Sequence, residues 1–171
     1  VPVGDVFFRK TFTLGNVEFG QVHICADNQY ELTVNGRRVA SGADWRKMDV
    51  HDVTELLKSG TNVIAVRVGN TDEGAAGLVA RVITKETAGT FESFSSDDTW
   101  RTSVKQFADW QRSNFRDAEW LPAEVLGPLG ATLPWGDEVV IADEGARFVV
   151  DKEFAIERLT TDEQTGSQVA M

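Results

Sequence analysis

Three of the five tryptophans stand among polar residues, a combination that suits the binding of a sugar. Trp45 precedes Arg46 in SGADWRKMD, Trp110 lies in FADWQRSN, and Trp135 stands between a proline and a glycine. A pyranose offers apolar C–H faces to an aromatic ring and hydroxyl groups to charged or amide side chains. We predict these four residues as ligand contacts, with at least one ring largely exposed. Burial is nevertheless the stronger expectation for each single ring, because a large ring gains more free energy in a core.

The stretch GNTDEGAAG, residues 69–77, is a second candidate, because it places polar side chains between glycines in a loop. Binding residues gather on such loops at the ends of a sheet. We predict Asn70 and Asp72 as ligand contacts. Carboxylate oxygens are also the ligands that calcium prefers, so Asp72 and Glu73 form a hypothetical structural calcium site. A plain solvated loop explains the same composition and is the stronger expectation.

Asp27 and Asn28 stand together just before the alternating run YELTV. Their oxygens suit a ligand or a cation. They also suit a turn, because both side chains bond to nearby backbone groups and tolerate left-handed conformations. The turn is the favoured interpretation.

The other residue types do not complete a catalytic centre. The single cysteine, Cys25, lies in an apolar strand pattern, and only His23 and His51 are available as partners, so we expect a buried core thiol. Acidic residues are plentiful, yet no pair is singled out for glycoside hydrolysis. The sequence contains no nucleophile elbow, phosphate-binding loop or zinc-ligand cluster. We therefore predict that the chain is not an enzyme and carries no cofactor.

Composition restricts the partners. The 171 residues suffice for one domain with a real core, and the formal net charge is −10. No basic stripe is present, which argues against nucleic acid, and an acidic surface disfavours anionic membranes. No apolar run reaches the roughly 18 residues that a membrane-spanning helix needs.

Period-two alternation of apolar and polar residues dominates the chain and predicts strands. Asn35-Gly36 predicts a tight hairpin, and DVTELLKSG, residues 52–60, predicts a single helical turn. Helical periodicity never holds for ten residues, so the fold class is all-β, an antiparallel β-sandwich with one or two short helical turns. The predicted strands are residues 5–14, 17–26, 30–34, 37–40, 62–70 and 77–86, with two more at 89–96 and 148–154.

ADNQYELTVNGRRV followed by DVTELLKSGTNVIAVRVGN resembles the jelly-roll, galactose-binding-like domains attached to glycoside hydrolases of the β-galactosidase and α-L-rhamnosidase types. The resemblance covers about residues 5–136 and is specific for the fold rather than for a ligand. SSDDTWRTS and FRDAEWLPAEVLGP share an Asp-x-x-Trp scheme. In the resembling domains such segments run along the sandwich and pin their tryptophan, here Trp100 and Trp120, against it.

The resemblance implies two parts, a jelly-roll domain over residues 1–136 and an acidic linker over residues 137–171 that begins a following domain. Residues 154–171 resemble the entry into a β-propeller of large multidomain proteins of planctomycete-type bacteria, in which a cytochrome segment often follows. The abrupt ends of the chain suggest a piece of something longer. The implied location is outside the cytoplasm.

The expected function is therefore that of a non-catalytic accessory module that recognises carbohydrate by ring stacking and hydrogen bonds. The alternative is a structural module that docks on the neighbouring propeller and binds no glycan.

Overall fold

The computed structural model describes residues 3–127, 129, 134–135 and 140–141. Its elements are short strands and one 3-10 turn, as the alternating sequence predicts. They are β1 (Gly4–Leu14), β2 (Val17–Ala26), β3 (Gln29–Val34), β4 (Arg37–Gly42), β5 (Lys47–Asp52), η1 (Thr54–Leu56), β6 (Gly60–Asn70), β7 (Leu78–Glu86), β8 (Phe91–Ser95), β9 (Arg101–Ser103), β10 (Leu121–Pro122) and β11 (Val140–Ile141).

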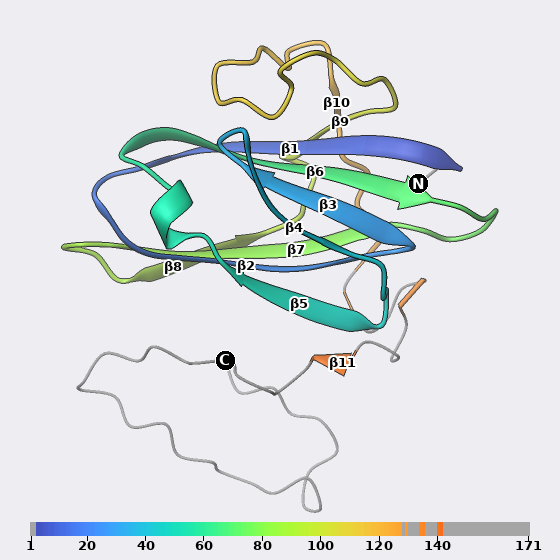
Figure 1. Cartoon of the computed structure of the whole chain (residues 1–171), viewed down its shortest axis with the longest axis horizontal. Coiled ribbons are helices and arrows are strands. Elements are labelled where there is room, and N and C mark those ends of the chain that lie inside the picture. Colours follow the sequence, from blue (N-terminus) through green and yellow to red (C-terminus); the bar gives the residue numbers. More distant parts are fainter. Residues whose placement is uncertain (1–2, 128, 130–133, 136–139, 142–171) are drawn as a thin grey trace, which may run out of the picture.

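The strands form two facing sheets, seen as two layers in Figure 1. Sheet A has the order β10-β9-β1-β6-β3-β4, and sheet B has the order β11-β5-β2-β7-β8. The chain passes repeatedly from one sheet to the other, so that consecutive strands such as β1 and β2 face each other across the core. The long pairings, β1 with β6 and β2 with β7, are antiparallel, whereas β11 joins β5 in parallel. The predicted antiparallel β-sandwich is confirmed.

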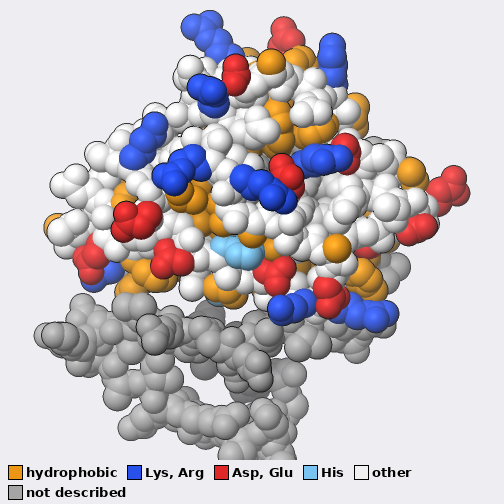
Figure 2. All heavy atoms as spheres, in the orientation of Figure 1, with side chains coloured by type: hydrophobic (Ala, Val, Ile, Leu, Met, Phe, Trp, Pro, Cys, Tyr) orange, Lys and Arg blue, Asp and Glu red, His pale blue; other side chains and the backbone are white. Residues whose placement is uncertain are grey.

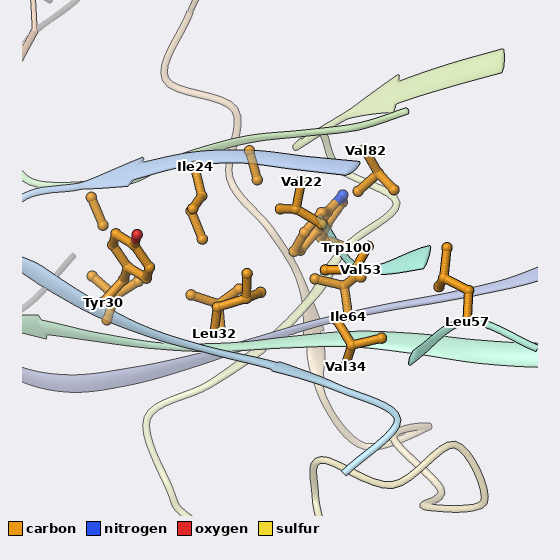
Figure 3. Close-up of a cluster of buried hydrophobic side chains, with 14 of the residues drawn as sticks. Val22, Ile24, Tyr30, Leu32, Val34, Val53, Leu57, Ile64, Val82 and Trp100 are labelled. Atoms are coloured by element: carbon orange, nitrogen blue, oxygen red, sulfur yellow. The ribbon is translucent and has the colours of Figure 1, made fainter. Parts of the chain in front are cut away.

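The core lies between the inner faces of the two sheets (Figure 3). Alternation places Tyr30, Leu32 and Val34 of β3 inward, because successive side chains of a strand point to opposite faces. Val22 and Ile24 of β2 meet them from sheet B. Trp100 is fully buried in this cluster and Trp120 is 5% exposed, so the expectation that both indoles pack against the sandwich is confirmed.

The Asn-Gly hairpin is fixed by a network of amide bonds. Asn35 and Gly36 have φ angles of 51° and 82°, the left-handed pair that a tight hairpin requires. The Asn35 side chain donates to Oδ1 of the fully buried Asn62, which also accepts from the backbone N–H of Lys58. The Asn62 amide donates in turn to the carbonyls of Lys58 and Gly60. The residues that carry the family resemblance therefore satisfy the buried polar groups of this corner.

A segment between β9 and β10 covers the outer face of sheet A, the yellow loop above β1 in Figure 1. Its residues Trp110 and Trp120 stack with ring centroids 6.0 Å apart, and Trp110 meets Phe7 of β1 edge-on at 5.1 Å. Phe107 and Phe115 complete this aromatic cluster. We call residues 104–120 the aromatic cap.

Arg9 of β1 holds the aromatic cap in place from below. Its side chain is buried, and its Nε lies 2.9 Å from Oδ2 of Asp117. The guanidinium also donates to the carbonyls of Trp110, Arg112 and Phe115. A buried guanidinium needs such partners, because an unpaired buried charge is costly. Asp117 therefore has a defined role in the second Asp-x-x-Trp segment.

Four strands were not predicted, and each absence has a physical reason. β5 was not predicted, because Asp49 and His51 point inward and break the apolar alternation. Both lie 2.8 Å from the Tyr30 hydroxyl, which donates to the Asp49 carboxylate. β9, β10 and β11 were also not predicted, because two or three residues are too few to show a period. The strand predicted at 148–154 and the tail at 142–171 lie outside the described residues.

None of the helices in the part of the chain that the structure describes is long and apolar enough to cross a bilayer.

Candidate functional site

Two of the predicted stacking rings are buried. Trp110 and Trp135 are 3% and 5% exposed, so neither is an exposed platform, and the stronger expectation of burial is confirmed for both. Trp110 lies inside the aromatic cap, and Trp135 packs with Cys25 and Met48 against the outer face of sheet B. Polar neighbours along the chain did not expose these rings, because tertiary contacts decide burial.

Trp45 is half-buried, so none of the three rings is largely exposed. Its carbonyl accepts hydrogen bonds from Trp135 Nε1 at 3.0 Å and from the Cys25 thiol at 3.4 Å. The guanidinium of Arg46 lies 4.7 Å from the Trp45 ring centroid, a cation–π distance. Asp44 shapes the turn by accepting from the Arg46 backbone N–H. Trp45 and Arg46 therefore form one amphipathic unit at the start of β5.

The predicted loop residues lie at the same end of the sandwich. Asn28 Oδ1 accepts from the backbone N–H of Thr71 at 2.8 Å and from its hydroxyl at 3.1 Å, which joins the turn before β3 to the loop after β6. Asn70 is buried and accepts from the Asp72 backbone N–H, whereas Asp72 and Glu73 are exposed. The favoured turn interpretation of Asn28 agrees with these contacts.

Contacts link the Trp45–Arg46 unit to the loop after β6. The backbone N–H of Asp27 donates to the carbonyl of Gly77, and a Cβ placed on Gly77 would lie 3.2 Å from the Trp135 ring. Trp135 in turn donates to Trp45. The structure therefore brings Trp45 and Arg46 together with the loop that carries Asp72, at the edge where β2, β5, β6 and β7 end or begin. We call this region the sandwich-end surface.

Electrostatics at the sandwich-end surface favour neutral forms of buried groups. Burial, with the neighbouring charge of Asp72, raises the pKa of the Asp27 carboxyl above its ordinary value. Burial raises the pKa of the Cys25 thiol to about 11, so it is not a nucleophile at neutral pH. The expectation of a buried core thiol at Cys25 is confirmed. Asp27 is the residue here whose charge a cation or a hydrogen-bond donor would stabilise.

No group of three or more histidine, cysteine, aspartate or glutamate side chains among the described residues is arranged to hold a metal ion. The calcium site at Asp72 and Glu73 therefore stays a prediction, with carboxylates that are exposed.

A groove of about 590 Å³ begins beside Trp135 and Gly77 and was not predicted from the sequence. The first residues of β7, from Leu78 to Arg81, form its floor, and residues 123–127 form one wall. His23 and Met48 of sheet B also line it. The sequence feature that could have indicated this groove is the run of apolar residues in LPAEVLGPLG, several of which remain exposed.

No family model matches the chain. Among curated proteins, it is 32% identical over 149 residues to an α-L-rhamnosidase of Streptomyces avermitilis, a match to 82% of the chain and 14% of the relative. It is 26% identical to an α-L-rhamnosidase of Formosa agariphila, covering 71% of the chain and 18% of the relative. The chain thus spans less than a fifth of the curated relatives it matches.

Solved structures share the fold. The Streptomyces avermitilis α-L-rhamnosidase complexed with L-rhamnose superposes with a TM-score of 0.75 and 30% identity, covering 82% of this chain and 14% of that one. The lectin of Pleurotus ostreatus in complex with GalNAc superposes with a TM-score of 0.76 and 30% identity, covering 82% of this chain and 41% of that one. The chain is therefore similar to one β-sandwich part of longer rhamnosidases and of a lectin.

Proposed function

We propose that the chain is a non-catalytic, carbohydrate-binding module of a longer protein. One observation carries the proposal. The same sandwich, at 30% identity over 82% of this chain, is shared with an enzyme crystallised with L-rhamnose and with a lectin crystallised with GalNAc. Because the chain corresponds to only 14% of that rhamnosidase, the rest of such a protein has room for the catalytic domain.

The sandwich-end surface is the proposed binding site. Trp45 offers the exposed part of its ring, with the Arg46 guanidinium over one face, and the loop after β6 offers the exposed side chain of Asp72, whereas the predicted contact Asn70 is buried. The partly desolvated Asp27 carboxylate adds a strong acceptor for hydroxyl groups, or a ligand for a calcium ion shared with Asp72. Weak affinity is expected, because the exposed ring area is small and the site is shallow.

A docking module without glycan binding is the second candidate, and the open apolar groove is the observation that favours it. In either case we place the parent protein outside the cytoplasm, on the strength of the family resemblance. A following β-propeller and a planctomycete-type parent rest on residues 154–171 alone, which lie outside the described residues.

The test is a glycan array with the complete 171-residue chain, run once with calcium and once with a chelator. We expect binding to a narrow set of glycans, including L-rhamnose or GalNAc termini. A blank array under both conditions would reject sugar recognition and favour docking. Binding that disappears with chelator would support the calcium site, and binding that survives would reject it.

Variants then locate the site. Trp45→Ala and Arg46→Ala are each expected to weaken a bound glycan at least about tenfold, which is about 1.4 kcal/mol. Phe91→Ala and Arg38→Ala are the matched controls, since both side chains are exposed on strands β8 and β4, away from this end. Circular dichroism checks that each variant is folded. Equal losses in variants and controls would contradict the proposed site.

A further inference from the structure

The groove beside sheet B gathers half of the large hydrophobic residues that are exposed in the described part of the chain. Val104, Val125, Leu126 and Leu129 line it, with exposed fractions of 71%, 59%, 50% and 41%. These are four of the eight large hydrophobic residues that are exposed in the described part of the chain. An apolar concavity of this kind marks a surface that a partner covers, because water is a poor neighbour for it.

The inner wall of the groove is already well ordered. The fully buried Trp100 donates from Nε1 to the carbonyl of Ser95 at 3.1 Å, and the backbone N–H of Ala123 donates to the Trp100 carbonyl at 2.8 Å. Residues 123–127 are therefore tied to the core at their first residue, while the following side chains, Val125 and Leu126, face solvent. The groove is a built surface with a fixed wall, rather than a gap left between strands.

The chain leaves the described structure at the same place. In β11, Val140 pairs with Lys47 and Ile141 pairs with Met48, and Met48 lines the groove. Residues 142–171 follow, and their first strongly apolar run is Phe148, Val149 and Val150. The six residues between Ile141 and Phe148 span at most roughly 20 Å when extended, at about 3.3–3.6 Å per residue. This run can therefore return to the groove without a further connection.

Sheet A provides a precedent within the molecule. Its outer face is covered by the aromatic cap, which is a later segment of the same chain and inserts Trp110 and Trp120 against β1. Covering a sheet with a following segment is efficient because a short tether gives a high effective concentration.

We propose that the groove is the docking site for the apolar run Phe148, Val149 and Val150 of the same chain. The run fills the space between β7 and residues 123–127 and covers the exposed side chains of Val125 and Leu126. The inference does not depend on sugar binding, because Trp45 and Arg46 do not line the groove, although Trp135 adjoins both surfaces.

Disulfide trapping in the complete chain tests the proposal. The test pair is Leu126→Cys with Val149→Cys, and the matched control is Leu126→Cys with Thr160→Cys. A disulfide forms only when the two Cα atoms come within about 7 Å. Cys25 does not interfere, because it is buried and its thiol pKa is about 11. We expect the test pair to oxidise on the order of tenfold faster than the control, within single chains and independently of protein concentration.

Two results would overturn the proposal. An undocked tail would favour the nearer cysteine by no more than about threefold, because loop closure depends weakly on length. A disulfide that links two chains and increases with protein concentration would assign the groove to a second copy instead.

Amide hydrogen exchange of residues 123–127 provides a readout without new cysteines. Phe148→Ser should accelerate exchange there, whereas the control Phe154→Ser should leave it unchanged. Identical exchange in the wild type and both variants would also overturn the proposal.

Discussion

The two outer faces of the sandwich differ in how they are covered. The outer face of sheet A lies under the aromatic cap, where two indoles and a buried arginine meet β1. The outer face of sheet B carries a mixture of side chains, including His23, the exposed Val50 and Phe91 at 36% exposed each, and the start of the apolar groove. Figure 2 shows acidic and basic side chains interspersed over one side of the molecule rather than gathered in a patch of one sign.

The comparison teaches that burial on one face is achieved by large rings plus one ion pair, whereas the other face keeps an apolar groove among the described residues. Arg9 makes the difference. It occupies a position on β1 that would face water in a two-layer sandwich, yet it is 1% exposed because the aromatic cap supplies four oxygen acceptors around it. On sheet B, Trp135 packs over Cys25 and Met48, whereas Arg81 on the same face is exposed.

The largest expected effect comes from removing a ring of the aromatic cap. Trp120→Ala should lower the free energy of unfolding by about 3–5 kcal/mol, the usual cost of deleting a buried aromatic side chain. The control on the other face, Phe91→Ala, should cost about 1 kcal/mol or less, because that ring is 36% exposed. Urea titration of both variants measures the difference. Equal losses would show that the two faces are equally packed.

The second effect concerns two arginine–aspartate pairs on the same sheet. Arg9→Ala should cost about 3 kcal/mol, since it removes a buried charge that holds Asp117 and three carbonyls. Arg67→Ala should cost at most about 1 kcal/mol, because its 2.7 Å pair with Asp5 is 46% and 37% exposed. Chemical denaturation measures both. A cost for Arg67→Ala as large as that for Arg9→Ala would contradict the importance of the cap.

A third, smaller effect tests whether the groove is covered. Leu126→Ser should lower the free energy of unfolding of the complete chain by about 1 kcal/mol if the tail packs on it. Val3→Ser is the control, with a side chain exposed to a similar degree, 57% against 50%, and should change stability by no more than about 0.5 kcal/mol. Thermal unfolding of both compares them. Indistinguishable unfolding midpoints of the two variants would show that the tail does not pack on Leu126 and that the groove is not covered.

The smallest effect is a pH dependence on the sheet B side. Burial, with the charge of Arg81, lowers the pKa of His23 below its ordinary value of 6.5, and burial also lowers that of His51 despite Asp49. The unfolded chain therefore binds these protons more readily than the folded one. Stability should be complete above pH 6.5 and should fall as the pH drops below 6.5 through the folded pKa values.

Denaturation midpoints on either side of that window measure the slope, and His23→Gln should flatten part of it while preserving a polar group beside Gln21. A slope that His23→Gln leaves unchanged would assign the whole dependence to His51.

The sequence predicted the parts of the fold that depend on period two and on turn chemistry. β1, β2 and β3 alternate apolar and polar residues, β6 and β7 are rich in β-branched residues, and Asn35-Gly36 adopts the left-handed angles that its residue types favour. β5 was not predicted because hydrogen bonds with Tyr30, nineteen or more residues earlier, stabilise Asp49 and His51 at inward positions.

The candidate site was predicted less well. The burial of Trp110 depends on Arg9 and Phe7, which lie about a hundred residues before it, and that of Trp135 depends on Gly77 and Trp45. Local neighbours such as Asp109 and Arg112 carry no information about those contacts, so the polar flanks could not show which contacts would bury each ring. Trp45 and the loop with Asp72 were placed at one end of the sandwich by strand order, which no local pattern reveals.

The place of β1 between β6 and β9 has a consequence for synthesis on the ribosome. Both partners of β1 are synthesised well after it, since Phe8 pairs with Val66 and with Thr102. Until those residues leave the exit tunnel, the phenylalanine-rich β1 segment has no strand to pair with. Contacts so distant along the chain slow folding, and the unpaired β1 segment is therefore exposed to aggregation during synthesis and is where a chaperone would act.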